Sequence, residues 1–267
     1  MSTKRVYAFI RFHLNYVASQ EGHTWIYISQ LKAAAKDSIS ECMELLEQVI
    51  SSESSCRTMF VVTANKIGLR KYYEYEMDSL DILRSINKMN DSASWNISQE
   101  IIEAGIKAAE EQQGFIYTQE QSELIRQAVQ NNVTVISGKA GTGKTSISRG
   151  IINIYKKANK SIACCALSAK AAQRITEATG SPSSTIHGLL GWSGTDFCHN
   201  HDNPLQADVL FLDEASMVNV DIFYHLVCAV KEGARVILCG DNRQLPPIGA
   251  GNIFSDLLEH SKDFNVN

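Results

Sequence analysis

Three glycines and a lysine in the middle of the chain have the spacing of a phosphate-binding loop. Residues 138–145 read Gly-Lys-Ala-Gly-Thr-Gly-Lys-Thr and fit the pattern G-x-x-x-x-G-K-[ST]. A triphosphate needs several N–H donors at close range, so the loop must lack side chains where its backbone meets the oxygens. We expect Lys144 to place its charge on the β- and γ-phosphates and the Thr145 hydroxyl to bind Mg²⁺.

The flanking sequence supplies the elements that position this loop. A β-branched run over 133–136 predicts a buried strand, and Ile147, Ile151, Ile152 and Ile154 predict one apolar face of the helix that follows. This context favours an ATP-binding P-loop over a glycine-rich turn with an incidental lysine. The residues expected to contact ATP are Gln121, Gly138, Ala140, Gly141, Thr142, Gly143, Lys144 and Thr145.

Polar side chains also follow two later apolar runs. Residues 207–212 lead into Asp213 and Glu214, and residues 235–239 are followed by Gln244. We expect Asp213 to hold Mg²⁺, Glu214 to orient and deprotonate an attacking water, and Gln244 to sense the γ-phosphate. The alternative is that both acids serve only a helix N-terminus. The residues expected to act in catalysis are Lys144, Asp213, Glu214 and Gln244.

Gln121 has two candidate roles. Thr118 is expected to cap a helix, and Gln121 at the third helical position completes a capping box. Its carboxamide also offers the one donor and one acceptor that match the edge of adenine. Because Gln121 comes shortly before the P-loop strand, the adenine role is favoured.

Composition says little about partners. The net charge is −4 and the pI is about 6.0, so any nucleic-acid contact must come from a local surface. Arg11 and His13 interrupt the apolar residues near the N-terminus, and no run reaches the length of a membrane span. We therefore expect a cytoplasmic protein with no membrane contact.

The seven cysteines favour free thiols in a reducing compartment, because their number is odd and no Cys-x-x-Cys pair occurs. Residues 197–201, Phe-Cys-His-Asn-His, raise the hypothesis of a zinc site. No second cluster completes a tetrahedral set of ligands, so a surface loop is preferred.

The sequence predicts an α/β fold in three parts. Residues 1–90 contain two predicted helices and a hairpin, which suggest a small, mostly helical, winged-helix-like module. Residues 91–114 are expected to form a linker and a helix, and the linker covers residues 90–97. Residues 115–267 are expected to form an ATPase domain. The first module either binds DNA or a partner, or is purely structural, and the sequence favours the structural alternative.

Together these motifs resemble the RecD-like branch of superfamily-1 DNA helicases, the group of stand-alone RecD-like proteins and exodeoxyribonuclease V alpha subunits. The resemblance is strong over 115–259 and looser over 20–90, with Ala169 and Pro247 departing from the usual Gly and Ser. It implies a RecA-like parallel sheet with helices on both faces, and an ATP-driven motor moving 5′ to 3′ on single-stranded DNA. The matching stretches are 118–121, 138–145, 168–172, 185–187, 213–217 (Asp-Glu-Ala-Ser-Met) and 240–246 (Gly-Asp-Asn-Arg-Gln-Leu-Pro).

The resemblance also implies roles that spacing alone does not give. It makes Gln121 the adenine reader and Gln244 the phosphate sensor, and it implies partners among nuclease or repair subunits in DNA repair and recombination. The residues that it places near single-stranded DNA are Ser168, Lys170, Thr185 and His187.

The family has a second RecA-like domain after the part that matches here. That domain carries arginines that complete the ATP site, so we expect this chain to be a helicase fragment with weak ATPase activity alone. One alternative is a nucleotide-gated DNA- or partner-binding P-loop protein without processive unwinding. Another is an unrelated P-loop ATPase, against which the stretch 240–246 argues.

Overall fold

The computed structural model describes residues 2–51, 58–89, 95–139, 141–260 and 264–266. Its contacts divide the chain into two compact units. Unit 1 comprises Met1–Asp78, Asn219–Asp221 and Pro247–Asn252, and unit 2 comprises Ser79–Val218, Ile222–Pro246 and Ile253–Asn267. This division falls inside a helix and differs from the boundaries at 90 and 114 expected from the sequence. Residues 90–94 of the expected linker lie outside the described residues.

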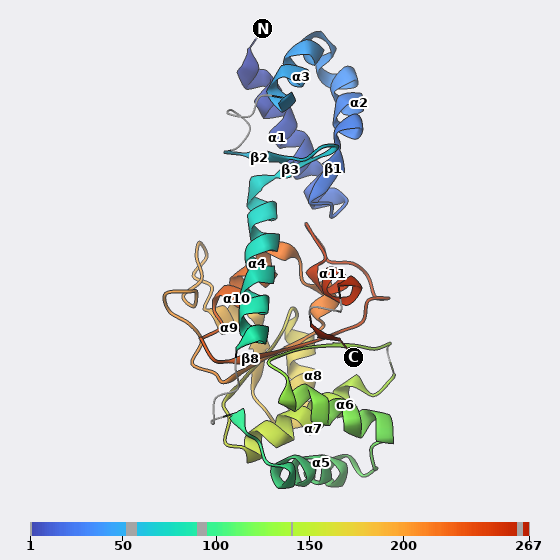
Figure 1. The fold of residues 1–267 in the computed structure, drawn as a ribbon, viewed down its shortest axis with the longest axis vertical. Coiled ribbons are helices and arrows are strands. Elements are labelled where there is room, and N and C mark those ends of the chain that lie inside the picture. The colour runs from blue at the N-terminus through green and yellow to red at the C-terminus, as the bar shows by residue number, and fades with distance from the viewer. Residues whose placement is uncertain (1, 52–57, 90–94, 140, 261–263, 267) are drawn as a thin grey trace. The chain divides into compact units, whose positions relative to one another are not determined.

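Unit 1 alternates helices with a small antiparallel sheet (Figure 1). The sheet has the order β1-β3-β2, and β2 and β3 form the expected hairpin. Helix, strand, two helices and a hairpin is a winged-helix arrangement, so that expectation is confirmed. Its elements are α1 (Thr3–Gln20), β1 (Trp25–Tyr27), α2 (Ile28–Ile39), η1 (Ser40–Cys42), α3 (Met43–Ser51), β2 (Phe60–Val62), β3 (Lys66–Leu69) and the first part of α4 (Arg70–Lys88).

The core of unit 1 comes from the apolar faces of its helices. Ile10, Leu31 and Leu46 are fully buried, one each from α1, α2 and α3, and they meet Phe60 and Ile67 of the hairpin. Unit 1 also includes two segments that come much later in the sequence. Within it, the Gly251 amide donates to the Gly22 carbonyl (2.8 Å), and the Lys71 amine lies 2.6 Å from the Asp221 carboxylate.

Unit 2 is built on a parallel sheet with the order β6-β5-β7-β8-β4-β9. In order, its elements after the end of α4 are α5 (Gln99–Gln113), α6 (Gln119–Gln130), β4 (Val133–Ser137), α7 (Lys144–Lys157), β5 (Ile162–Ala166), α8 (Ala169–Thr179), β6 (Ser183–Thr185), α9 (Ile186–Leu190), β7 (Val209–Asp213), η3 (Ala215–Met217), α10 (Val220–Cys228, its first two residues counted with unit 1), β8 (Arg235–Gly240), α11 (Ile253–Glu259) and β9 (Asn265–Val266).

Both faces of this sheet are buried, as the near-continuous apolar strands predict. Phe211 and Ile237 contribute to the core shared with α5, α6, α7 and α8, whereas Leu212 and Leu238 point to the opposite face and are equally buried. The RecA-like parallel sheet with helices on both faces, expected from the sequence, is thereby confirmed. Among the described helices, none is both long and apolar enough to cross a membrane.

Strand register places the functional segments at one edge of this sheet. Ser137 pairs with Gly240 between β4 and β8, and Ala166 pairs with both Asp213 and Thr185. The last residues of these strands therefore lie in a row, and the loops that follow them meet at the same edge. In doubly wound α/β folds this carboxyl edge is where ligands bind.

Candidate nucleotide-binding site

The P-loop follows β4, and its glycines are required by the backbone. Gly141 and Gly143 have φ values of 81° and 90°, in the left-handed region that strains other residues. A Cβ at Gly138 would lie 2.7 Å from Thr142 Oγ1, and one at Gly143 would lie 2.6 Å from Gln121 Nε2. The loop is thus a cradle of bare backbone at the start of α7, which suits a phosphate group. Ala140 lies outside the described residues.

Lys144 is the first residue of α7 and turns back over the loop. Its amine donates to the carbonyl oxygens of Gly138 and of Lys139, the second at 3.0 Å, and lies 3.9 Å from a carboxylate oxygen of Asp241. Thr142 stabilises the same turn, because its hydroxyl donates a hydrogen bond to the Lys139 carbonyl at 2.8 Å. Thr145 is exposed, so its hydroxyl is accessible to a ligand.

Gln121 lies beside the P-loop and forms the capping box expected of it. Its Oε1 accepts from the Thr118 amide (3.1 Å), and the Thr118 hydroxyl accepts from the Gln121 amide (3.2 Å). The capping box uses the carboxamide oxygen, while Nε2 faces Gly143. The capping role therefore engages the acceptor of the carboxamide but not the donor, and the adenine role stays a prediction.

Asp213 and Glu214 stand at the end of β7. Burial raises the pKa of Asp213, while the Glu214 amide, which donates to Asp213 Oδ1 at 2.9 Å, and the charge of Lys144 oppose that rise. Burial and the negative charge of Asp213 raise the pKa of Glu214, and Arg174 opposes this. Glu214 has a φ of 54°, an unusual value for a residue with a side chain and one that is found preferentially at functional sites.

Gln244 follows β8 and is exposed. Its Nε2 lies 3.5 Å from Asp241 Oδ2, and the same carboxylate accepts from the Arg243 amide at 3.1 Å. Asp241 was not among the residues predicted for the site, yet it is buried and connects the loop after β8 with the P-loop lysine. The sequence feature that could have indicated Asp241 is an acidic residue directly after a buried strand.

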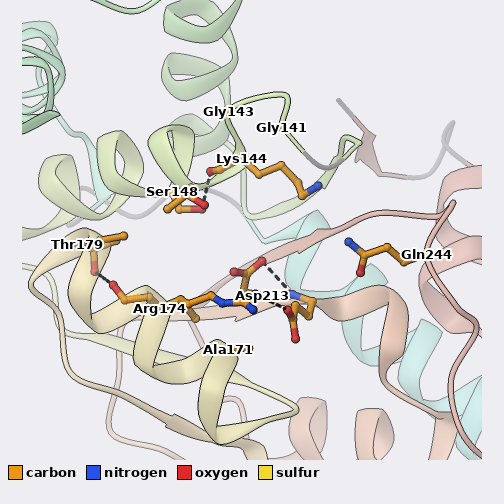
Figure 2. A pocket seen from close by; sticks show the side chains of 13 residues that line it. Gly141, Gly143, Lys144, Ser148, Ala171, Arg174, Thr179, Asp213 and Gln244 are labelled. Carbon is orange, nitrogen blue, oxygen red and sulfur yellow. Dashed lines mark hydrogen bonds and ion pairs between the residues drawn. The ribbon is translucent and has the colours of Figure 1, made fainter. Parts of the chain in front are cut away.

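One pocket of about 430 Å³ brings these segments together. It is lined by the P-loop and the start of α7, by Asp213 and Glu214, and by Gln244. Figure 2 shows Lys144, Asp213 and Gln244 around a common space, with the side chain of Arg174 of α8 passing beside Asp213. Arg174 was not predicted, although it lies one helical turn after Lys170.

The donor set of this pocket fits Mg²⁺. Thr145 and Asp213 both line it, and a hydroxyl and a carboxylate are oxygen ligands of the kind that Mg²⁺ combines with phosphate oxygens and water. Within the described ranges, no cluster of three or more His, Cys, Asp or Glu side chains could hold a metal. In the stretch raised as a zinc site, His199 Nδ1 lies 3.2 Å from the Asn203 carbonyl, and Cys198 is an exposed thiol.

The residues expected near DNA lie along the same sheet edge. Ser168 caps α8 by accepting from the Ala171 amide, and Thr185 caps α9 by accepting from the Gly188 amide, both at 3.1 Å. Lys170 is exposed in the first turn of α8. The His187 ring lies 6.2 Å from the Trp192 ring and 5.8 Å from the Phe197 ring, centroid to centroid. The two hydroxyls have structural roles, and the DNA roles of Ser168, Lys170, Thr185 and His187 stay predictions.

Comparison with known proteins agrees with this geometry. Residues 121–250 match the model of an AAA domain family. The ATP-dependent RecD2 DNA helicase of Deinococcus radiodurans is 38% identical over 134 residues, which are 50% of this chain and 19% of that protein. The RecBCD enzyme subunit RecD of Buchnera aphidicola subsp. Schizaphis graminum is 27% identical over 260 residues, 87% of this chain and 41% of that protein.

The chain is similar to RecD-type DNA helicases. The resemblance seen in the motifs is thereby confirmed. A crystal structure of the Pif1 helicase from Candida albicans is also similar, with 26% identity, a TM-score of 0.40, and coverage of 50% of this chain and 34% of that one. This chain spans 19% and 41% of the length of the RecD2 and RecD relatives named above.

Proposed function

We propose that this chain is the ATP-binding part of an ATP-dependent DNA helicase. The observation that carries the proposal is the convergence of Lys144, Asp213, Glu214 and Gln244 on one pocket at the carboxyl edge of the sheet. These side chains come from segments that are up to a hundred residues apart, and each has a chemical role in phosphoryl transfer to water. The RecD-type relatives support DNA as the partner.

Each residue of the pocket has a defined task in this proposal. The P-loop amides and the N-terminus of α7 bind the phosphates, and Lys144 exchanges its loop carbonyls for phosphate oxygens. Thr145 and Asp213 hold Mg²⁺, which when bound neutralises charge on the phosphates. Glu214 orients the attacking water and accepts its proton. Gln244, in the loop after β8, senses the γ-phosphate. Gln121 donates from its Nε2 to adenine.

The DNA strand is proposed to run along the neighbouring part of the same edge. Lys170 supplies a positive charge there, and His187 presents an aromatic ring, the two features that suit a single strand. By resemblance, movement is 5′ to 3′ and needs a second RecA-like domain whose arginines complete the ATP site. Nuclease or repair subunits are the protein partners that the RecD relationship suggests.

Single-turnover ATP hydrolysis, with the 267-residue chain in excess over labelled ATP, tests this proposal even if hydrolysis is slow. We expect Lys144→Ala to weaken ATP binding and to abolish hydrolysis, because the phosphates lose their positive charge. The matched control is Lys157→Ala, which removes an exposed lysine from the far end of the same helix. Equal hydrolysis by the wild type and Lys144→Ala would contradict the proposed site.

Adding an oligothymidylate strand separates the helicase from a simple binding protein. A DNA-stimulated rate that depends on Lys144 supports the motor. ATP-dependent DNA binding without any hydrolysis would instead favour a nucleotide-gated binding protein.

A further inference from the structure

The Glu214 carboxylate contacts a cation that has no role in the proposed reaction. Arg174 Nη1 of α8 lies 3.5 Å from Glu214 Oε1. Across the described parts of the chain, Arg174 is the one cation within ion-pairing distance of this carboxylate. The neighbouring carboxylate of Asp213 repels it. The position of Glu214 therefore depends on a side chain from a different element.

The two side chains of this ion pair differ in their freedom to move. The side chain of Glu214 is 24% exposed and follows a backbone in the left-handed region, whereas that of Arg174 is 61% exposed. A guanidinium that is largely in solvent can leave its partner at small cost, because exposed ion pairs are weak. The contact is therefore suited to breaking when a stronger anion approaches Arg174.

Helix α8 brings such an anion close in the proposed DNA complex. Lys170 and Arg174 are four residues apart on α8, so their side chains share a helix face. Ser168 caps the same helix, and the first turn of α8 is the part that is proposed to face DNA. A phosphate bound beside Lys170 would attract the Arg174 guanidinium, because arginine and phosphate form strong charge-assisted hydrogen bonds.

We propose that Arg174 is a positioning residue that restrains Glu214 in the absence of DNA and releases it when a DNA phosphate attracts the guanidinium. This inference rests on the proposed function. A carboxylate paired with a guanidinium is a poorer partner for the attacking water, since the guanidinium draws one oxygen toward itself and offsets part of the negative charge. Helix α8 thereby couples the DNA edge to the hydrolytic residue without any movement of the sheet.

The test is the rate of single-turnover ATP hydrolysis without DNA. We expect Arg174→Ala to hydrolyse ATP about two- to fivefold faster than the wild type, the range that corresponds to a partly exposed ion pair. An oligothymidylate strand should then add less to the rate than it adds in the wild type. Arg174→Lys keeps the positive charge and should stay close to the wild-type rate.

The matched control is Gln173→Ala, which removes the neighbouring side chain of α8 and its bond to Glu177 but touches neither partner. It should leave the rate without DNA unchanged, and thermal unfolding of each variant checks that α8 remains folded. The double variant Arg174→Ala/Glu214→Ala should be no faster than Glu214→Ala, because the gain acts through Glu214.

The outcomes separate this inference from the function on which it rests. Hydrolysis that depends on Lys144 but is unchanged or slower in Arg174→Ala overturns the restraint and leaves the ATPase proposal standing. If Arg174→Ala increases the rate of hydrolysis and the increase persists in the double variant, the proposed restraint is also overturned. Hydrolysis that is independent of Lys144 overturns the proposed function itself.

Discussion

Asp208 is an ionisable side chain whose environment predicts a pH-dependent stability. Its Oδ2 accepts from the Ser161 amide (2.8 Å) and hydroxyl (2.7 Å), and its Oδ1 lies 2.9 Å from the Lys231 amine. Burial alone would raise the pKa of Asp208, but the hydrogen bonds and the lysine charge outweigh it and lower the pKa to about 2 from the usual 3.8. The native state therefore favours the ionised carboxylate.

We expect this stabilisation to be complete above about pH 4 and to disappear as the pH falls toward 2, because the folded pKa is below the unfolded one. Asp208→Asn should lower the free energy of unfolding near neutral pH by about 1–2 kcal/mol, after allowance for solvent screening. Urea unfolding over a series of pH values measures this. The difference from the wild type should shrink in acid, whereas Asp202→Asn in an exposed loop should show no such trend. A pH-independent difference would contradict the assignment.

The placement of Asp213 and Glu214 in the pocket could be predicted because a few residues of local sequence determine it. A strand that ends in Asp213-Glu214 delivers both side chains to the carboxyl edge, whatever the rest of the chain does. Arg174 and Asp241 escaped prediction because their partners are distant in sequence. Arg174 faces Glu214 only after β5 and β7 pair, and Asp241 nears Lys144 only after β4 and β8 pair.

Helices α5 and α7 approach each other closely at Gly105. A Cβ there would lie 2.4 Å from Ile154 Cγ1 and 2.7 Å from Ile154 Cα, so the backbone of α7 leaves no space for a methyl group. We expect Gly105→Ala to destabilise the protein by about 1–3 kcal/mol through overpacking. The roughly 1 kcal/mol that alanine gains over glycine in a helix offsets part of this cost, so the net loss of stability is expected to be up to about 2 kcal/mol.

Urea unfolding measures the effect of Gly105→Ala. The matched control is Ala104→Ser, which changes an exposed neighbour on α5 and should stay within about 0.5 kcal/mol of the wild type. An unchanged or increased stability of Gly105→Ala would show that the two helices can move apart at that point.

Helices and strands with a clear hydrophobic periodicity could be predicted from the sequence, whereas the segments that connect them were harder to predict. The strand before the P-loop and the helix after it agree with the apolar pattern of the sequence. Trp95 was assigned to a linker from its polar neighbours, yet it packs against the core of unit 2 and donates its indole N–H to the Gly233 carbonyl at 2.9 Å. Arg235 Cζ lies 4.3 Å from the ring centroid of Trp95, and Lys160 Nζ lies 4.5 Å from it. These cations come from beyond the P-loop, so no local pattern indicates the contact.

At the scale of the whole molecule, the two units have separate hydrophobic cores. One core lies in the winged-helix-like part and includes Ile10, and another lies on one face of the sheet of unit 2 and includes Ile151. The sequence indicates two parts, because the pattern changes from helices with a hairpin to strands alternating with helices. It does not indicate that Asn219–Asp221 and Pro247–Asn252 join unit 1, since both follow motifs of the predicted ATPase domain.

Separate cores predict that a core mutation weakens its own unit. Ile10→Ala and Ile151→Ala remove the same atoms from fully buried sites in helices, and each should cost about 2–5 kcal/mol. Hydrogen exchange monitored by mass spectrometry distinguishes the units, because amide protection reports local unfolding. We expect Ile10→Ala to accelerate exchange in β2 and β3 about 30-fold or more, with little change in β4 and α7, and Ile151→Ala to show the reverse. If either variant accelerated exchange equally in both units, the chain would unfold as one cooperative body, and the ATP site would share the stability of the winged-helix-like module.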